Sequence, residues 1–85
     1  MKSFTTPDFW KLYYDLSPHL KQKVKRAYQL WKENSLHPSL HFKKVGKNLW
    51  SVRITNDYRA LAIKKGNDYY WFWVGNHNQY DNILN

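Results

Sequence analysis

Four residues in the second half of the chain have side chains that could cut RNA without a metal ion: Arg53, Arg59, His77 and Tyr80. Cleavage of a phosphodiester needs a base for the 2′-hydroxyl, an acid for the leaving 5′-oxygen and cations for the charged phosphorane. An imidazole exchanges protons near neutral pH, a phenol can donate one, and guanidinium groups supply positive charge. We therefore predict that these four residues form a catalytic set.

The histidines also have simpler interpretations. His77 could cap the C-terminal turn and take no part in chemistry. His37 and His41 have the spacing of a metal-binding pair, but Pro38 disrupts a helix between them and no cysteine or nearby carboxylate completes a site. We therefore expect neither a metal nor a cofactor.

Two helices are predicted in the first part of the chain. Apolar residues recur every three or four positions in residues 7–16 and again in residues 18–33. Each segment opens with a capping residue followed by proline, Thr6 with Pro7 and Ser17 with Pro18. Because the junction between them is short, we expect an antiparallel helical hairpin.

From Leu40 onward the apolar period changes to two, which is typical of strands. The expected strands are residues 40–45, 49–55, 58–65 and 69–75, and residues 1–4 could add an edge strand. Consecutive strands with short turns favour antiparallel pairing. We therefore predict a single domain over residues 1–85 of the α+β class, with the helical hairpin packed on one face of a twisted antiparallel sheet.

The other face of this sheet should be uncovered. Strand alternation places Arg53 and Arg59 there, and in strand 69–75 it places Trp71 and Trp73 beside them. The core residues expected from that last strand are Tyr70, Phe72 and Val74. The two arginines share a face only if the turn between their strands contains an odd number of residues, and we predict an odd number.

Cations among exposed rings suit single-stranded RNA, because phosphates bind the charge and bases stack on the aromatic side chains. We predict that Trp71 and Trp73 stack bases, and that Lys43 and Lys44 bind phosphates beside them. The second helix adds further basic residues, which form either its solvated face or another contact to nucleic-acid phosphate. They are Lys21, Lys23, Lys25, Arg26 and Lys32.

The charge of the chain restricts its partners. Fourteen Lys and Arg against six Asp and Glu give a net charge of +8, which favours a polyanionic partner or serves solubility alone. The sequence has no cysteine, no apolar stretch of signal-peptide length and no stretch that could span a membrane. We expect a cytoplasmic protein without a membrane partner.

Several segments together resemble the RelE/ParE superfamily of toxins from bacterial type II toxin–antitoxin modules. They are "HPSLHFKKV", "LWSVRITNDYRALAI" and "WFWVGNHNQYD" after the helical hairpin. The resemblance covers nearly the whole chain and implies the α+β fold already predicted. It matches Arg53 to the basic sheet residue of the family and Arg59 to the arginine of its YR motif. His77 matches the basic residue or histidine that the family has after a glycine. Tyr80 resembles a C-terminal tyrosine of several members.

The resemblance implies one of two activities. The RelE-like branch cleaves messenger RNA in the ribosomal A site, and the ParE branch inhibits DNA gyrase without a nuclease site. Ser51 stands where some members have a catalytic lysine, so that base is absent here, but Arg59 and His77 favour the nuclease. The resemblance also implies an antitoxin partner, for which acidic character would match the basic domain, together with the ribosome and its message. A basic RNA-binding module without activity is the third possibility.

Overall fold

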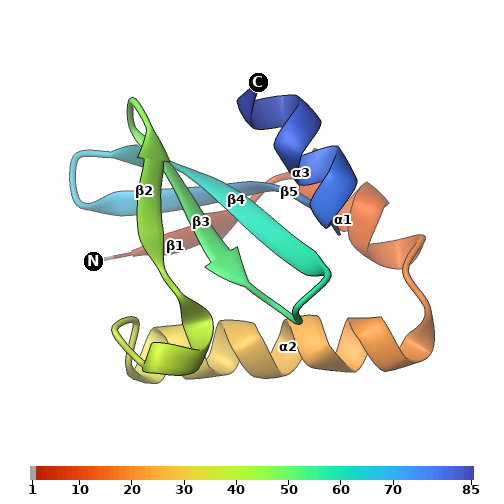
Figure 1. Ribbon diagram of the computed structural model, residues 1–85. Coiled ribbons are helices and arrows are strands. Elements are labelled where there is room, and N and C mark those ends of the chain that lie inside the picture. Colours follow the sequence, from red (N-terminus) through yellow and green to blue (C-terminus); the bar gives the residue numbers. More distant parts are fainter. Residues whose placement is uncertain (1) are drawn as a thin grey trace.

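The computed structural model describes residues 2–85, in which one short strand, three consecutive helical segments, four consecutive strands and a last helix follow one another (Figure 1). In chain order the elements are β1 (Ser3–Thr5), α1 (Pro7–Tyr14), α2 (Pro18–Glu33), the short 3₁₀ helix η1 (Pro38–Leu40), β2 (Lys43–Gly46), β3 (Leu49–Arg53), β4 (Tyr58–Lys65), β5 (Asp68–Asn76) and α3 (His77–Leu84). The α+β class is confirmed. None of these helices is long and apolar enough to cross a bilayer.

Local capping explains where the first two helices begin. The Thr6 hydroxyl accepts a hydrogen bond from the Phe9 amide at 3.3 Å, and the Ser17 hydroxyl accepts one from the Leu20 amide at 3.3 Å. A proline occupies the first helical position in both cases, where its missing N–H costs no intrahelical bond. The predicted helix starts are therefore confirmed.

The strands form one sheet in the order β1-β5-β4-β3-β2. β2 to β5 are antiparallel neighbours, as predicted, whereas β1 joins the edge of the sheet parallel to β5. The edge strand considered for residues 1–4 is therefore present as β1. Met1 lies outside the described part of the chain. The sheet is thus mostly antiparallel, with one parallel edge.

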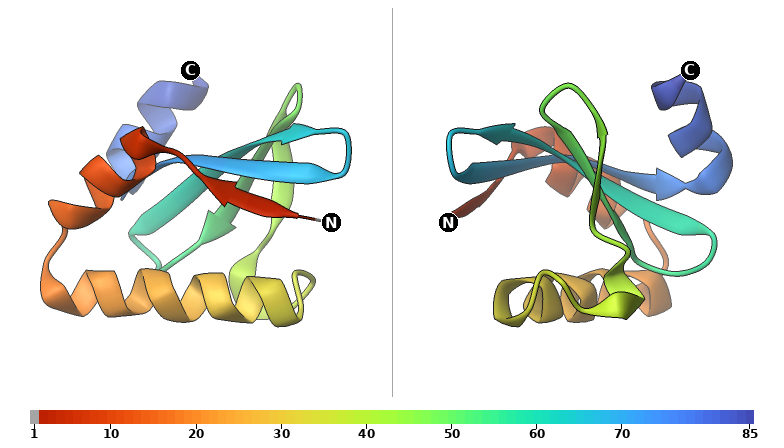
Figure 2. Two further views of the ribbon diagram at one scale, coloured as in Figure 1. Left: turned by 180° about the vertical axis from the view of Figure 1, so that it is seen from behind. Right: turned by 60° about the vertical axis from the view of Figure 1, so that its left-hand side comes forward.

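The core lies between the sheet and the first two helices (Figures 1 and 2). Trp31 of α2 is 1% exposed, and its ring meets the Tyr69 and Trp71 rings of β5 edge to face at centroid distances of 5.4 and 5.3 Å. Val52 and Ala60 of the sheet belong to the same buried cluster. Burial of these large rings is what stabilises so small a domain.

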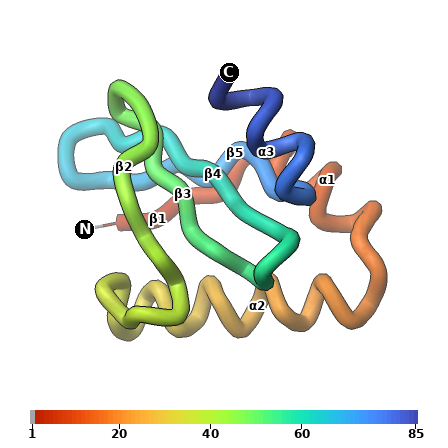
Figure 3. The backbone as a smooth tube through the Cα atoms, viewed as in Figure 1, coloured from red at the N-terminus to blue at the C-terminus, as the bar shows by residue number. Residues whose placement is uncertain are grey.

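The opposite face of the sheet is partly covered, contrary to the prediction that it lies open. The chain runs from β5 straight into α3, which turns back over the sheet (Figure 3). Tyr80 of α3 is buried against Ser51, and both Ser51 and Leu61 are almost fully inaccessible. The sequence predicts only a turn after Gly75, and this helix was therefore missed.

The aromatic strand β5 faces the core differently from the prediction. A register irregularity lies where Leu61 pairs with Trp73 and the adjacent Ala62 pairs with Trp71, so β5 has one extra residue there. This bulge changes the alternation: Trp71 is 3% exposed and packs in the core, and Tyr69 is buried in place of Tyr70. The prediction that Trp71 lies exposed beside the arginines is therefore wrong, and the buried ring is not available to stack on a base.

Candidate functional site

Arg53 and Arg59 form the centre of the candidate site. They are directly paired across β3 and β4, and residues 54–58 separate them, which confirms the predicted odd number. Directly opposed residues of an antiparallel pair place their side chains on the same face. Ser51 and Leu61 lie on this face as well, and Ser51 accepts a hydrogen bond from Tyr80 of α3. It is therefore the face on which α3 lies.

The turn between β3 and β4 holds both guanidinium groups by hydrogen bonds. Arg59 donates through Nη1 to the carbonyl oxygens of Thr55 at 2.7 Å and Tyr58 at 3.3 Å. Arg53 donates through Nε to the Ser39 carbonyl at 3.2 Å and through Nη1 to Asn56 Oδ1 at 3.4 Å. All these partners are neutral acceptors, so the arginines keep their full charge for an anion.

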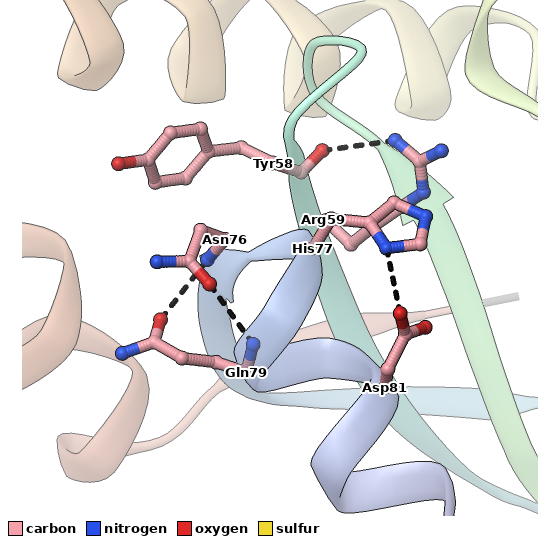
Figure 4. Close-up of polar contacts among 6 residues, drawn as sticks. All are labelled: Tyr58, Arg59, Asn76, His77, Gln79 and Asp81. Carbon is pink, nitrogen blue, oxygen red and sulfur yellow. Dashed lines mark hydrogen bonds and ion pairs between the residues drawn. The ribbon is translucent and has the colours of Figure 1, made fainter.

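His77 is positioned by the start of α3 beside the same turn. Its amide donates to the Asp57 carbonyl at 2.7 Å, and Arg59 pairs with Gly75, two residues before it. The helix begins with a reciprocal capping box, in which Asn76 and Gln79 each accept from the other's amide (Figure 4). The position of His77 relative to Arg59 is therefore set by backbone pairing and capping.

Gly75 must be glycine for this junction to form. A Cβ there would lie 2.4 Å from the Trp73 ring and 2.6 Å from Gln79 Oε1. Both distances are below van der Waals contact, so any side chain would displace the ring or the capping glutamine. Because glycine has no side chain, the Trp73 ring can lie directly over the Gly75 backbone where β5 ends and α3 begins.

The imidazole of His77 is paired with a carboxylate. Its Nδ1 lies 3.0 Å from Asp81 Oδ2, one helical turn further along α3, and the imidazole side chain is 43% exposed. Since a carboxylate only accepts hydrogen bonds, Nδ1 carries the proton in this contact, and Nε2 of a neutral ring is left as the proton acceptor. The pair thus presents an oriented base at an accessible surface (Figure 4).

Tyr80 has a structural position instead of the predicted catalytic one. It is 6% exposed, and its hydroxyl donates to Ser51 Oγ at 3.3 Å beneath α3. Its ring also lies edge-on to the His77 imidazole, with a centroid distance of 5.8 Å. Its phenol is therefore not exposed on the surface where a catalytic role would need it, because α3 turns this side chain toward the sheet.

Replacing Tyr80 by phenylalanine separates these two roles. The variant loses one hydrogen bond to Ser51 and keeps the ring, so we expect stability to fall by about 1 kcal/mol. We expect the growth inhibition that the family resemblance implies to persist within a few-fold of wild type on induced expression. Urea denaturation and growth curves measure both quantities, and a loss of growth inhibition without a loss of stability would restore the catalytic role.

The other predicted RNA contacts are divided between the two faces. Trp73 lies on the face of Arg59, as predicted, but is only half exposed because it packs over Gly75. Lys43 pairs with Ser51 and shares that face, whereas Lys44 pairs with Trp50 and belongs to the opposite one. Both lysines are exposed, and only Lys43 is placed to act together with the arginines.

Two elements of the site were absent from the sequence analysis, although the sequence contains signals for them. Asp81 follows His77 by four residues, which is the spacing of neighbours on one helical face. Asn76 and Gln79 have the spacing of a capping box, which marks a helix start. Together these signals predict a helix carrying a histidine–carboxylate pair.

The fold and the site agree with a known family. A family model described as a ParE-like toxin domain matches residues 18–82, which is most of the chain. The match spans α2, β2 to β5 and nearly all of α3, and it therefore includes every residue of the site described above. The chain therefore belongs to the ParE-like toxins, within the RelE/ParE superfamily of toxin–antitoxin toxins.

Solved structures with similar folds support this placement. The RelB–RelE antitoxin–toxin complex of Methanococcus jannaschii matches with a TM-score of 0.74 and 18% identity, over 96% of this chain and 99% of that one. The YoeB/ParE toxin of Agrobacterium tumefaciens gives 0.70 and 18% over 91% and 99%. YafQ of E. coli gives 0.71 and 13% over 93% and 96%. No curated protein sequence matches the chain.

Proposed function

We propose that this toxin is an endoribonuclease that cleaves messenger RNA on the ribosome and thereby stops translation. The observation that carries the proposal is the His77–Asp81 pair at the start of α3, which lies over the face that presents Arg53 and Arg59. A base and two cations beside one accessible surface supply two of the three kinds of group that phosphodiester cleavage uses, and solvent can supply the acid.

The chemistry follows from the roles of these groups. Nε2 of His77 takes the proton of a ribose 2′-hydroxyl, and the 2′-oxygen attacks the adjacent phosphorus. The bond from phosphorus to the 5′-oxygen breaks, which leaves a 2′,3′-cyclic phosphate and a 5′-hydroxyl. Arg53 and Arg59 stabilise the extra negative charge of the phosphorane. Water supplies the proton for the leaving oxygen, since the Tyr80 phenol is buried.

The second element of the proposal is a cognate antitoxin. The Methanococcus jannaschii relative is solved as an antitoxin–toxin complex, and this chain has the same fold. With fourteen basic and six acidic residues, the surface suits an acidic segment that extends over it. Such a segment would neutralise the arginines and occupy the face that the message needs.

Inhibition of DNA gyrase is the second candidate function, because the matching family is described as ParE-like. A gyrase inhibitor of this kind needs no general base, so the two functions predict different roles for His77. The oriented imidazole has no evident use in a protein that acts by binding alone.

Controlled expression without an antitoxin tests the proposal. We expect translation to stop first, with new 5′-hydroxyl ends mapped by primer extension within the ribosome-bound regions of messages. Messages that carry no ribosomes should remain intact. DNA breaks that appear while translation continues and messages stay whole would show that gyrase is the target.

A further inference from the structure

A groove of about 360 Å³ lies between α2, η1 and the turn from β3 to β4. Its walls are formed by the middle of α2 on one side and by Ser39 and residues 53–56 on the other. Figure 2 shows these segments meeting at the lower edge of the sheet, away from α3. The groove is thus separate from the His77–Asp81 pair, although Arg53 belongs to both regions.

The rim of this groove is positively charged. Of the described residues that line it, Lys23, Arg26 and Arg53 carry positive charge, and none carries a carboxylate. Lys23 and Arg26 are three residues apart on α2, so their side chains are neighbours on one face of the helix. Arg53 is held at the rim by its bonds to Ser39 and Asn56.

The floor of the groove is apolar. Ala27 and Leu30 of α2, Leu40 of η1 and Ile54 beyond β3 supply it. Cations around an apolar floor match a nucleotide, whose phosphate is charged and whose sugar and base have apolar surfaces. An acidic peptide with apolar side chains would also match these groups, and RNA is favoured because Arg53 connects the groove to Arg59 of the proposed cleavage site.

We propose that this groove binds the sugar–phosphate backbone of RNA beside the cleaved linkage, an inference that rests on the proposed ribonuclease function. Arg53 connects the two regions, because it faces Arg59 across the strand pair and also lines the groove. RNA whose scissile phosphate contacts Arg59 passes Arg53 and places a neighbouring phosphate between Lys23 and Arg26. The groove therefore holds the strand in position and leaves the chemistry to His77.

Binding measurements on a cleavage-deficient protein test the groove. In the His77→Ala background, we compare Lys23→Gln/Arg26→Gln with the matched variant Lys25→Gln/Lys32→Gln, which removes equal charge from exposed positions of the same helix. We expect the groove variant to bind a short fluorescent single-stranded RNA about tenfold more weakly. The salt dependence of binding should fall by about 0.7 in log–log slope per lost phosphate contact, and the control should bind nearly as the parent does.

Three further arms identify the ligand. Weaker binding of the oligonucleotide supports the groove as a site for the cleaved RNA. Weaker co-sedimentation with ribosomes at unchanged oligonucleotide binding would overturn that assignment, since the groove would then contact ribosomal RNA instead. Equal RNA and ribosome binding by the groove and control variants would overturn it. So would a larger loss of binding to polyglutamate than to RNA, since the groove would then serve an acidic protein segment.

This inference can fail separately from the proposed function. If groove and control variants bind RNA equally while the His77 side chain is still required for cleavage, only the groove assignment is wrong. If neither the wild type nor any variant cleaves messages, but the groove variant alone binds RNA weakly, the protein is an RNA-binding toxin without nuclease activity.

Discussion

Replacing His77 by alanine is expected to reduce cleavage of ribosome-bound messages by a factor of about 10² to 10⁴, the usual contribution of a general base. The fold should survive, because Asn76 provides the helix cap and alanine suits the first position of α3. The lost contact with Asp81 is a partly exposed pair within one helix, worth about 0.2–0.5 kcal/mol. Mapping 5′-hydroxyl ends by primer extension after induction measures the effect.

His19→Ala is the matched control, because His19 is an exposed histidine on α2 and lies outside the site. We expect it to cleave as the wild type does. Asp81→Asn keeps an oxygen acceptor for Nδ1 but removes the negative charge, so we expect an intermediate loss of about tenfold. Full cleavage by a folded His77→Ala protein would exclude the imidazole as the base and with it the proposed mechanism.

The second large effect is expected at Trp71. Replacement by alanine removes a ring that is 3% exposed, its edge-to-face contact with Trp31 and the hydrogen bond from Nε1 to Ser3 Oγ at 3.2 Å. Large-to-small changes of buried aromatic residues cost about 3–5 kcal/mol. A domain of this size has a total stability of about 4–13 kcal/mol, so the variant should lose a large fraction of it and unfold at a much lower urea concentration. Equilibrium urea denaturation followed by circular dichroism measures the loss.

Trp10→Ala provides the comparison, since Trp10 is 40% exposed and should contribute about 1 kcal/mol. The result also distinguishes the two assignments of Trp71. A base-stacking residue would lose RNA binding at unchanged stability, whereas a core residue loses stability first. A Trp71→Ala protein as stable as wild type would contradict the buried position.

Much of the fold could be predicted because it depends on local patterns. Apolar residues repeat every three to four positions in α1 and α2 and every two in the strands, and this repeat indicates which face of each element is buried. The threonine and serine caps and the prolines after them determine where the helices start. The odd spacing between Arg53 and Arg59 is confirmed as well, although the strand patterns alone also allowed an even-numbered turn.

The errors concern features that depend on neighbouring elements. Alternation in β5 is interrupted by the bulge opposite Leu61 and Ala62, and one extra residue moves Trp71 from the outer face to the core. The burial of Tyr80 follows from α3 turning back over the sheet, and no periodic pattern in the strands indicates that turn. The groove likewise exists only because η1, α2 and the β3–β4 turn meet.

The sequence alone therefore determined the class of fold, the excess of basic residues and most of the residue types from which a nuclease site is proposed. These are properties of composition and of local period, which each segment carries by itself. Tertiary structure decided which face each side chain occupies and which of them act together, since a bulge or a folded-back helix changes exposure without changing the pattern. His77 and Asp81 form a pair only because α3 is a helix, and the pair lies on the same face of the sheet as the two arginines only because α3 folds back over that face.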